Sequence, residues 1–174
     1  LLEAIIILRE KYNNFHLKII GDGNALISAK KIVNENNLNQ FVEFYSWKNS
    51  YEIEKLLHES HILVLPSWSE GFPNTLLEAM ASGLAVITTK VGEIPNFLTH
   101  YKDSLLIDSK SKFQISDAIS ILIENKILFS QISKNGYQLV KENFNSEESI
   151  KKLCQTIKNS ILKKKIFFKI KNNT

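Results

Sequence analysis

The stretch "ILVLPSWSEGFPNTLLEAM", residues 62 to 80, joins a short apolar run to a loop and a helix-like pattern. The run "ILVL" is apolar at every position, which is typical of a central parallel strand that is covered on both faces. After the loop, apolar side chains recur at three- and four-residue spacing, at Leu76, Ala79 and Met80. The stretch therefore predicts a buried strand, a loop and an amphipathic helix in succession.

The same alternation of strand-like and helix-like segments continues along the chain. Short apolar or β-branched runs predict further strands at 16–20, 41–44, 85–88 and 104–107. Helical spacing predicts helices at 1–12, 25–36, 50–60 and 93–99, followed by two or three more to about residue 165. Ser50 is the expected cap of the third helix. This order predicts an α/β fold, a Rossmann-like parallel sheet with helices on both faces.

The loops that follow the predicted strands are the expected place for a ligand. Ligands of parallel α/β sheets bind beyond the carboxyl ends of the strands. Four loops follow predicted strands, at 21–23, 45–49, 66–74 and 89–93. We therefore expect all four loops to lie on one rim of the sheet.

Charge divides the chain into a folded body and a basic tail. The formal net charge is +4, but residues 151–174 hold eight lysines and no acid, which leaves −4 on residues 1–150. We interpret 1–150 as one domain and 151–174 as a basic C-terminal helix or tail. The lone cysteine, Cys154, excludes an internal disulfide and fits a reducing compartment. Because Leu1 lies in helix-like sequence without an initiator methionine, we expect the chain to be part of a longer protein.

Two glutamates bracket the loop and the start of the helix in the opening stretch. If the helix begins near Asn74, Glu78 falls on its polar side, and its side chain leans toward amides that favour an anion. A carboxylate repels that anion, so sugar hydroxyls beside it are the natural partner. Glu70 could approach the same ligand from the loop, where Gly71 lets the backbone pass close by. Alternatively, both glutamates are solvated surface acids.

The segment "EGFPNTLLEAMASG", residues 70–83, resembles the donor-site signature of retaining, GT-B-fold glycosyltransferases of the family 4 type. In that family, two glutamates bracket a nucleotide-sugar. The similarity extends to "IIGDG" (19–23), "HILVLPSWSEGFP" (61–73) and "VGEIPNFL" (91–98), and covers roughly residues 1–145. It implies that the chain is the donor-binding, C-terminal half of a GT-B fold. The N-terminal acceptor domain of the family would then be absent from this chain.

The resemblance also implies a role for each residue of the motif. Glu70, the candidate catalytic residue, would hold hydroxyls of the transferred sugar, and Glu78 would bind the ribose hydroxyls of the nucleotide. The sugar and the diphosphate would face the backbone amides of Gly71, Phe72, Asn74 and Thr75.

Two features of the family are not found in this chain. After the fourth strand the family often has paired glycines, whereas here Gly92 is followed by Glu93. The "G-R-x-x-x-x-K-G" stretch, whose Arg and Lys neutralise the diphosphate, would lie just before Leu1. We therefore expect helix amides and these upstream cations together to stabilise the departing diphosphate in the parent enzyme, and helix amides alone to do so in this chain.

Two residues outside the glutamate motif have two interpretations each. Gly21, in the turn after the first predicted strand, either makes a tight turn or brings its backbone to the ligand. Trp47 either stacks on the nucleotide base or packs locally. We include both among the candidate substrate-binding residues.

The sequence indicates no metal site and no cofactor apart from the donor. The four histidines show no metal-ligand spacing.

The tail segment 160–174 mixes Lys with Ile and Phe. This segment either contacts an anionic membrane surface or packs on the missing domain as a final helix. No nucleic acid is expected as a partner, because no recognition module accompanies the basic tail.

These observations lead to one expected function and two alternatives. We expect the donor-binding part of a hexosyltransferase that transfers a hexose from a UDP- or GDP-sugar to a growing glycan, with retention. The acceptor would be a polysaccharide, a lipopolysaccharide or a lipid-linked glycan, and the location the cytoplasm or the cytoplasmic face of the membrane. The isolated chain should be inactive without its N-terminal domain. The alternatives are a nucleotide-sugar epimerase on the same fold and a non-catalytic nucleotide-sugar-binding module.

Overall fold

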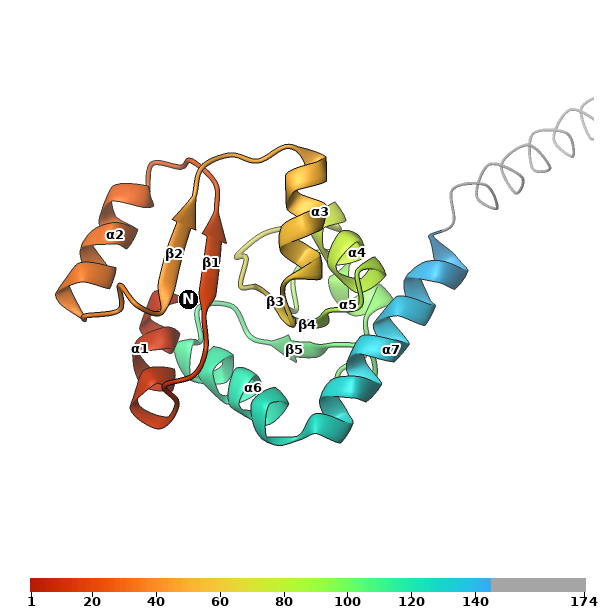
Figure 1. Cartoon of the computed structure of the whole chain (residues 1–174). Helices are drawn as coiled ribbons and strands as arrows, with labels where there is room; N and C mark the ends of the chain where they lie inside the picture. Colours follow the sequence, from red (N-terminus) through yellow and green to blue (C-terminus); the bar gives the residue numbers. More distant parts are fainter. Residues whose placement is uncertain (145–174) are drawn as a thin grey trace, which may run out of the picture. The chain divides into compact units, whose positions relative to one another are not determined.

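The computed structural model describes residues 1–144 (Figure 1). Contacts divide the chain after Gln138, and the unit Leu1–Gln138 holds the five described strands and every predicted site residue. Of the second unit, only residues 139–144 are described. The predicted domain boundary at 150 and the whole basic tail, with its proposed membrane segment, lie outside the described residues.

Five short parallel strands alternate with helices in the predicted order. The strands are β1 (Leu17–Ile20), β2 (Val42–Tyr45), β3 (Ile62–Leu65), β4 (Ala85–Thr89) and β5 (Leu105–Ile107). The helices are α1 (Leu2–Lys11), α2 (Leu26–Glu35), α3 (Ser50–His58), α4 (Asn74–Ala81), α5 (Ile94–Phe97), α6 (Lys112–Glu124) and α7 (Lys126–Asn143). The predicted α/β class is confirmed. None of the described helices is long and apolar enough to span a bilayer.

Backbone hydrogen bonds pair the strands in two parallel groups. In the smaller sheet, β1 pairs with β2, with Leu17 opposite Val42. In the larger sheet, β4 lies between β3 and β5, with Ile87 opposite both Val64 and Leu105. The sequence predicted one continuous sheet, whereas the described strands form two, because no hydrogen-bonded ladder joins β1 to β3.

The middle of the larger sheet is occupied by β4 and not, as the sequence predicted, by β3. All five residues of β4 are buried, whereas the four residues of β3 are only partly buried. An apolar run indicates what covers the two faces of a strand, but it carries no information on which strands pair with its edges. The pattern "ILVL" therefore identified the strand but not its place in the sheet.

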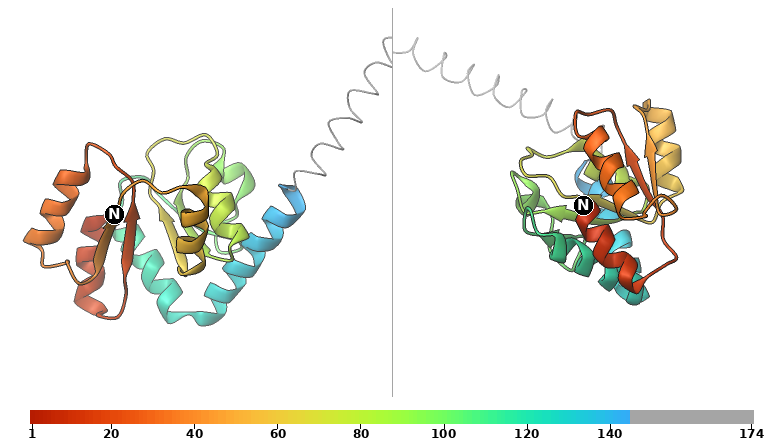
Figure 2. Two further views of the ribbon diagram at one scale, coloured as in Figure 1. Left: turned by 45° about the horizontal axis from the view of Figure 1, so that its top comes forward. Right: turned by 90° about the vertical axis from the view of Figure 1, so that its left-hand side faces the viewer.

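Helices cover both faces of the larger sheet (Figures 1 and 2). Ala85 and Ile87 of β4 belong to the main hydrophobic core. The same core contains residues of α1 and α6, among them Leu8 and Ile119. Because neighbouring strand residues point to opposite faces, the fully buried Val86 faces the side on which α4 packs against β4. With both faces covered, the strand ends and their loops are the parts that a ligand can approach.

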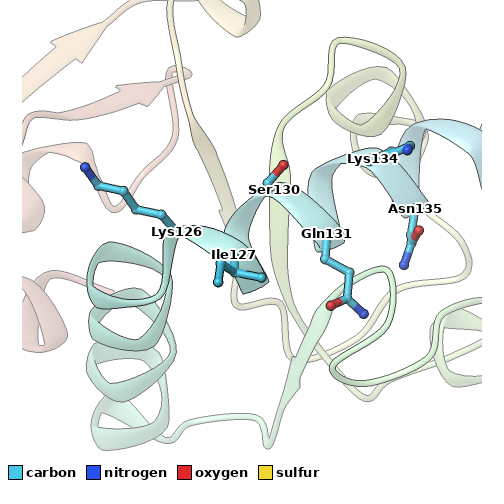
Figure 3. Close-up of a pocket in the computed structure, with 6 residues that line it drawn as sticks. All are labelled: Lys126, Ile127, Ser130, Gln131, Lys134 and Asn135. Carbon is cyan, nitrogen blue, oxygen red and sulfur yellow. The ribbon is translucent and has the colours of Figure 1, made fainter.

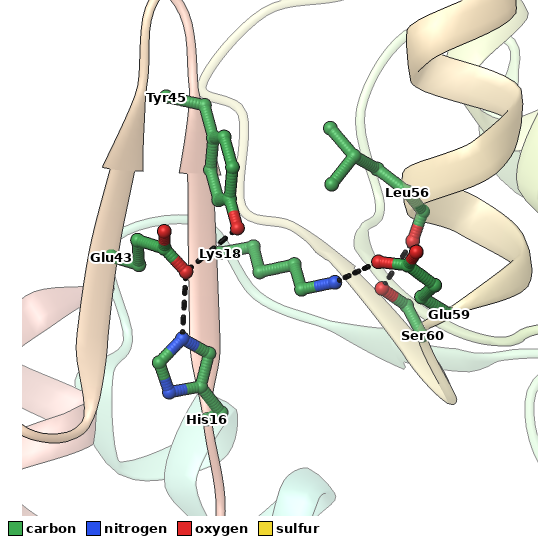
Figure 4. A network of polar contacts seen from close by, with 7 residues as sticks. All are labelled: His16, Lys18, Glu43, Tyr45, Leu56, Glu59 and Ser60. Atoms are coloured by element: carbon green, nitrogen blue, oxygen red, sulfur yellow. Dashed lines mark hydrogen bonds and ion pairs between the residues drawn. The ribbon is translucent and has the colours of Figure 1, made fainter.

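Polar contacts connect the smaller sheet to the end of α3 (Figure 4). Lys18 Nζ, on β1, donates to Glu59 Oε2 over 2.9 Å. On β2, Glu43 Oε2 accepts a hydrogen bond from Tyr45 OH at 2.6 Å and lies 3.2 Å from His16 Nε2. The hydrogen bonds from Tyr45 and His16 lower the pKa of Glu43. Because these groups are at least partly exposed, their ion pairs contribute little to stability.

The N-terminus of α3 is closed by a capping box. Asn49 Oδ1 accepts from the amide of Glu52 at 3.0 Å, and Glu52 Oε2 accepts from the amide of Asn49 at 3.1 Å. The prediction that Ser50 caps this helix is therefore wrong by one residue. Both side chains are good caps, but only Asn49 has a glutamate three residues later, as a capping box requires.

Substitution of the cap tests this local account. Asn49→Ala should lower the free energy of unfolding by about 1 kcal/mol, because the amide of Glu52 loses its acceptor. Ser50→Ala, one residue later, serves as the matched control and should have a much smaller effect. Urea unfolding of both variants measures the difference, and equal losses would contradict the assignment of the cap to Asn49.

Candidate functional site

Helix α4 presents Glu78 to solvent because it buries its apolar side. Glu78 is exposed. The residues that the helix buries, all 0% exposed, are Leu76, Ala79 and Met80, as their spacing predicts. The helix begins at Asn74, and its N-cap, Pro73, makes no side-chain cap hydrogen bond. The amides of the first turn are therefore not satisfied by a capping side chain, and they lie at the positive end of the helix dipole.

Glu70 lies just before this helix, in the β3–α4 loop (residues 66–73), and is partly buried. Its Oε1 accepts a hydrogen bond from Ser67 Oγ at 2.7 Å, which orients the carboxylate within the loop. At the next residue, Gly71, an added Cβ would meet nothing within 4 Å. The fold itself thus gives no steric reason for glycine at this position, whereas a ligand close to the backbone would give one.

The predicted amide donors lie around the start of α4. The ring of Phe72 packs against that of Phe97 in α5, with ring centroids 4.9 Å apart, so this side chain is anchored to the protein. Asn74 and Thr75 are the first two residues of α4, and both are exposed. The chain thus brings Phe72, Asn74 and Thr75 to one helix end, directly after Glu70 and Gly71.

The end of β4 and the turn after it, residues 89–93, are hydrogen-bonded to the β3–α4 loop. Thr89 Oγ1 donates to the carbonyl oxygen of Ser67 at 2.7 Å. The amide of Glu93 donates to the carbonyl oxygen of Gly71 at 3.0 Å. These two contacts hold the loop on either side of Glu70.

Gly92 lies between these contacts and touches the loop directly. Its φ is +56°, and an added Cβ would lie 1.9 Å from the carbonyl oxygen of Glu70. No side chain can occupy that space without displacing one of the two segments. In the sequence, Gly92 was of interest only because Glu93 follows it where the family often has a second glycine. A contact between segments about 20 residues apart leaves no local pattern, and the glycine itself was the available signal.

Trp68 and Lys110 contact each other at the same rim, and the sequence analysis did not predict either as a site residue. Trp68 belongs to the β3–α4 loop and is 71% exposed. Lys110, which follows β5, places its Nζ 4.5 Å from the centroid of the Trp68 ring. An exposed cation–π contact of this kind contributes about 0.5–1 kcal/mol. A tryptophan in a predicted rim loop was the signal that could have drawn attention to it.

Gly21 and Trp47 lie together at the carboxyl ends of β1 and β2. Gly21 has a φ of +134°, and its amide donates to the carbonyl oxygen of Tyr45 at 3.0 Å, so the turn itself requires glycine. The amide of Trp47 donates to Asp22 Oδ2 at 2.7 Å, while the residue is 73% exposed. Local packing therefore covers little of Trp47. A ligand role for either residue stays a prediction.

Charged side chains also follow directly after β4 and β5. Lys90 Nζ lies 3.2 Å from Asp108 Oδ1, and Gln114 donates to the other carboxylate oxygen at 2.9 Å. The hydrogen bond from Gln114 and the nearby Lys90 lower the pKa of Asp108. Within residues 1–144, no group of three or more His, Cys, Asp or Glu side chains could hold a metal ion.

A surface hollow on α7 is separate from this rim (Figure 3). It measures about 570 Å³ and is lined by residues of that one helix: Lys126, Ile127, Ser130, Gln131, Lys134 and Asn135. Asn135 already donates to the carbonyl oxygen of Lys102 at 2.8 Å. None of the predicted site residues lines the hollow.

Residues 1–139 match the family described as "Glycosyl transferases group 1". The chain belongs to this family, and the predicted resemblance is confirmed at this level. An uncharacterized glycosyltransferase of Methanocaldococcus jannaschii is 30% identical over 129 residues, which cover 74% of this chain and 36% of the relative. A Campylobacter jejuni relative, N,N'-diacetylbacillosaminyl-diphospho-undecaprenol alpha-1,3-N-acetylgalactosaminyltransferase, is 32% identical over 111 residues, 62% of this chain and 30% of the relative. The chain thus spans about a third of these curated relatives.

Solved structures with the same fold include a C-terminal domain on its own. The C-terminal domain of a glycosyl transferase group 1 family protein from Francisella tularensis is 32% identical, with a TM-score of 0.76 over 83% of this chain and 77% of that domain. The Anabaena protein HepE in complex with UDP has a TM-score of 0.82 over 91% of this chain and 44% of its own, at 16% identity. The second likeness concerns the fold alone.

Proposed function

We propose that this chain is the donor-binding part of a glycosyltransferase that transfers a hexose from a nucleotide-diphosphate sugar to a growing glycan. The observation that carries the proposal is the placement of Glu70 and Glu78 on either side of the uncapped start of α4, within the region that matches the family. The acceptor would be a polysaccharide, a lipopolysaccharide or a lipid-linked glycan.

The names of related proteins support this class of substrates. The Campylobacter jejuni relative is named for transfer of N-acetylgalactosamine to a diphospho-undecaprenol-linked sugar. HepE was solved in complex with UDP-glucose, and the pneumococcal O-GlcNAc transferase GtfA in complex with UDP and GlcNAc. A UDP- or GDP-linked sugar is therefore our proposed donor. Because the chain spans about a third of its curated relatives (36% and 30%), the acceptor and the complete reaction are proposals about a whole protein of their length.

In the proposed reaction, each glutamate has a separate part. The exposed Glu78 accepts hydrogen bonds from the ribose hydroxyls, and Glu70, oriented by Ser67, accepts them from hydroxyls of the sugar. As the bond from the anomeric carbon to the diphosphate oxygen breaks, negative charge grows on the diphosphate, and amides at the start of α4 stabilise it. The oxygen of an acceptor hydroxyl forms the new bond to the anomeric carbon, with retention of configuration, and the proton of that hydroxyl passes to the departing diphosphate.

The proposal also includes a second domain and a location in the cell. Positioning donor and acceptor together supplies much of the acceleration of a two-substrate reaction, so the acceptor would be held by a second, N-terminal domain. The protein would act in the cytoplasm or on the cytoplasmic face of the membrane. The basic segment 160–174 would either contact anionic lipid there or pack on the second domain. No metal or cofactor is required in this proposal, since the helix amides stabilise the leaving group.

Removal of the Glu78 carboxylate tests the ribose contact. Glu78→Ala should weaken binding of UDP or GDP by about 1.5–3 kcal/mol, the range for hydrogen bonds to a charged group. Stability should be preserved because the side chain is exposed. Asp117→Ala, at an exposed position of α6, is the matched control. Calorimetry with both nucleotides measures the effect, and unchanged affinity for both would refute this role.

Neutralisation of Glu70 tests the sugar contact. Glu70→Gln should weaken binding of UDP-glucose or GDP-mannose by about 1.5–3 kcal/mol, because a carboxylate binds hydroxyls more strongly than an amide does. The affinity for bare UDP or GDP should barely change. Equal losses for the nucleotide-sugar and the bare nucleotide would contradict the assignment of Glu70 to the sugar.

A further inference from the structure

We propose that the end of β4 and the turn after it, residues 89–93, position the carboxylate of Glu70. The positioning residues are Thr89 and Gly92 of this segment and Ser67 of the β3–α4 loop. The inference rests on the proposed function, in which Glu70 contacts the sugar of the donor. It adds residues that act through Glu70 without touching the ligand themselves.

The first link runs from the end of β4 to the backbone of the β3–α4 loop. Thr89 is 0% exposed, and its hydroxyl donates to the carbonyl oxygen of Ser67 at 2.7 Å. Leaving a buried hydroxyl without a hydrogen-bond partner costs free energy, so this bond should persist in the folded protein. Because β4 is the fully buried central strand of its sheet, the loop is attached to a rigid element.

The second link runs from Ser67 to the carboxylate. The contact from Thr89 fixes the backbone of Ser67, and Ser67 Oγ donates to Glu70 Oε1 at 2.7 Å. A hydrogen bond to an ionised carboxylate is stronger than one between neutral groups. The orientation of Glu70 is therefore set by a chain of two hydrogen bonds that begins in the buried sheet.

The third link holds the backbone of Glu70 itself. Gly92, with φ at +56°, approaches so closely that an added Cβ would lie 1.9 Å from the carbonyl oxygen of Glu70 and 2.6 Å from that of Gly71. The amide of Glu93 donates to the same carbonyl oxygen of Gly71 at 3.0 Å. The turn thus fixes the backbone of the loop at Glu70 and Gly71. Any side chain at position 92 would push Glu70 out of place.

A binding experiment separates positioning from simple loss of structure. The readout is the ratio of the affinities for UDP-glucose and UDP, and for GDP-mannose and GDP, measured by calorimetry with the whole chain. Thr89→Val keeps the shape of the side chain but removes the hydroxyl, whereas Thr89→Ser keeps the hydroxyl. Thr89→Val and Ser67→Ala should lower the ratio about tenfold, the change that corresponds to loss of about 1.4 kcal/mol. Affinity for the bare nucleotide should stay the same, and Thr89→Ser should retain the ratio of the unaltered chain.

Gly92→Ala should reduce the ratio further, because it displaces the backbone of Glu70. If this variant does not fold, the comparison of Thr89→Val with Thr89→Ser still decides. A merely structural role would lower the melting temperature and weaken the nucleotide and the nucleotide-sugar alike. That outcome, or an unchanged ratio in Thr89→Val, would overturn the proposal.

Amide hydrogen exchange without any ligand separates this proposal from the proposed function. Residues 67–71 should exchange faster in Thr89→Val than in Thr89→Ser, because the loop loses its link to β4. If the unaltered chain binds none of the four probes, the proposed function fails. The exchange rates then still test whether Thr89 holds the β3–α4 loop. Equal exchange in the two variants would overturn the proposed link.

Discussion

The packing of α4 against β4 determines the geometry of the rim. Leu76, Ala79 and Met80 must be buried, and this burial turns Glu78 to solvent and brings the start of the helix to the end of β3. The β3–α4 loop then joins two fixed elements. Its conformation is determined further by the turn after β4, which contacts it through Thr89, Gly92 and Glu93. A single strand, β4, thus supports both glutamates of the proposed donor site, one through a helix and the other through a loop.

The order and type of the elements could be predicted because they depend on local patterns. Helical spacing identified the buried residues of α4 and, for a helix assumed to start near Asn74, the exposed position of Glu78. Strand pairing could not be predicted in the same way: "ILVL" suggested a central strand, whereas β4 takes that place and β1 pairs only with β2 among the described strands. The cap of α3 was assigned to Ser50 instead of Asn49, because cap residue types were considered without the spacing to Glu52.

The candidate site shows the same division between local and long-range information. Glu70 and Glu78 were predicted from the strand, loop and helix pattern around them, and their roles stay predictions. The family match agrees with the resemblance that this motif suggests. The contacts that hold Glu70 come from Thr89 and Gly92, which are about 20 residues further along the chain. Such contacts follow from tertiary packing and leave no periodic pattern in one sequence. Gly21 and Trp47 are held by separate contacts at the ends of β1 and β2, and their share in ligand binding stays a prediction.

The central claim, that the donor binds at the strand ends around Glu70 and Glu78, is tested most directly by mapping amide chemical shifts. The ¹⁵N-labelled chain would be titrated with UDP-glucose and, separately, with GDP-mannose. The account predicts that one of these donors causes its largest shifts in residues 67–78 and in the turn at 89–93. Shifts concentrated instead along the α7 hollow, or no shifts with either donor, would contradict it.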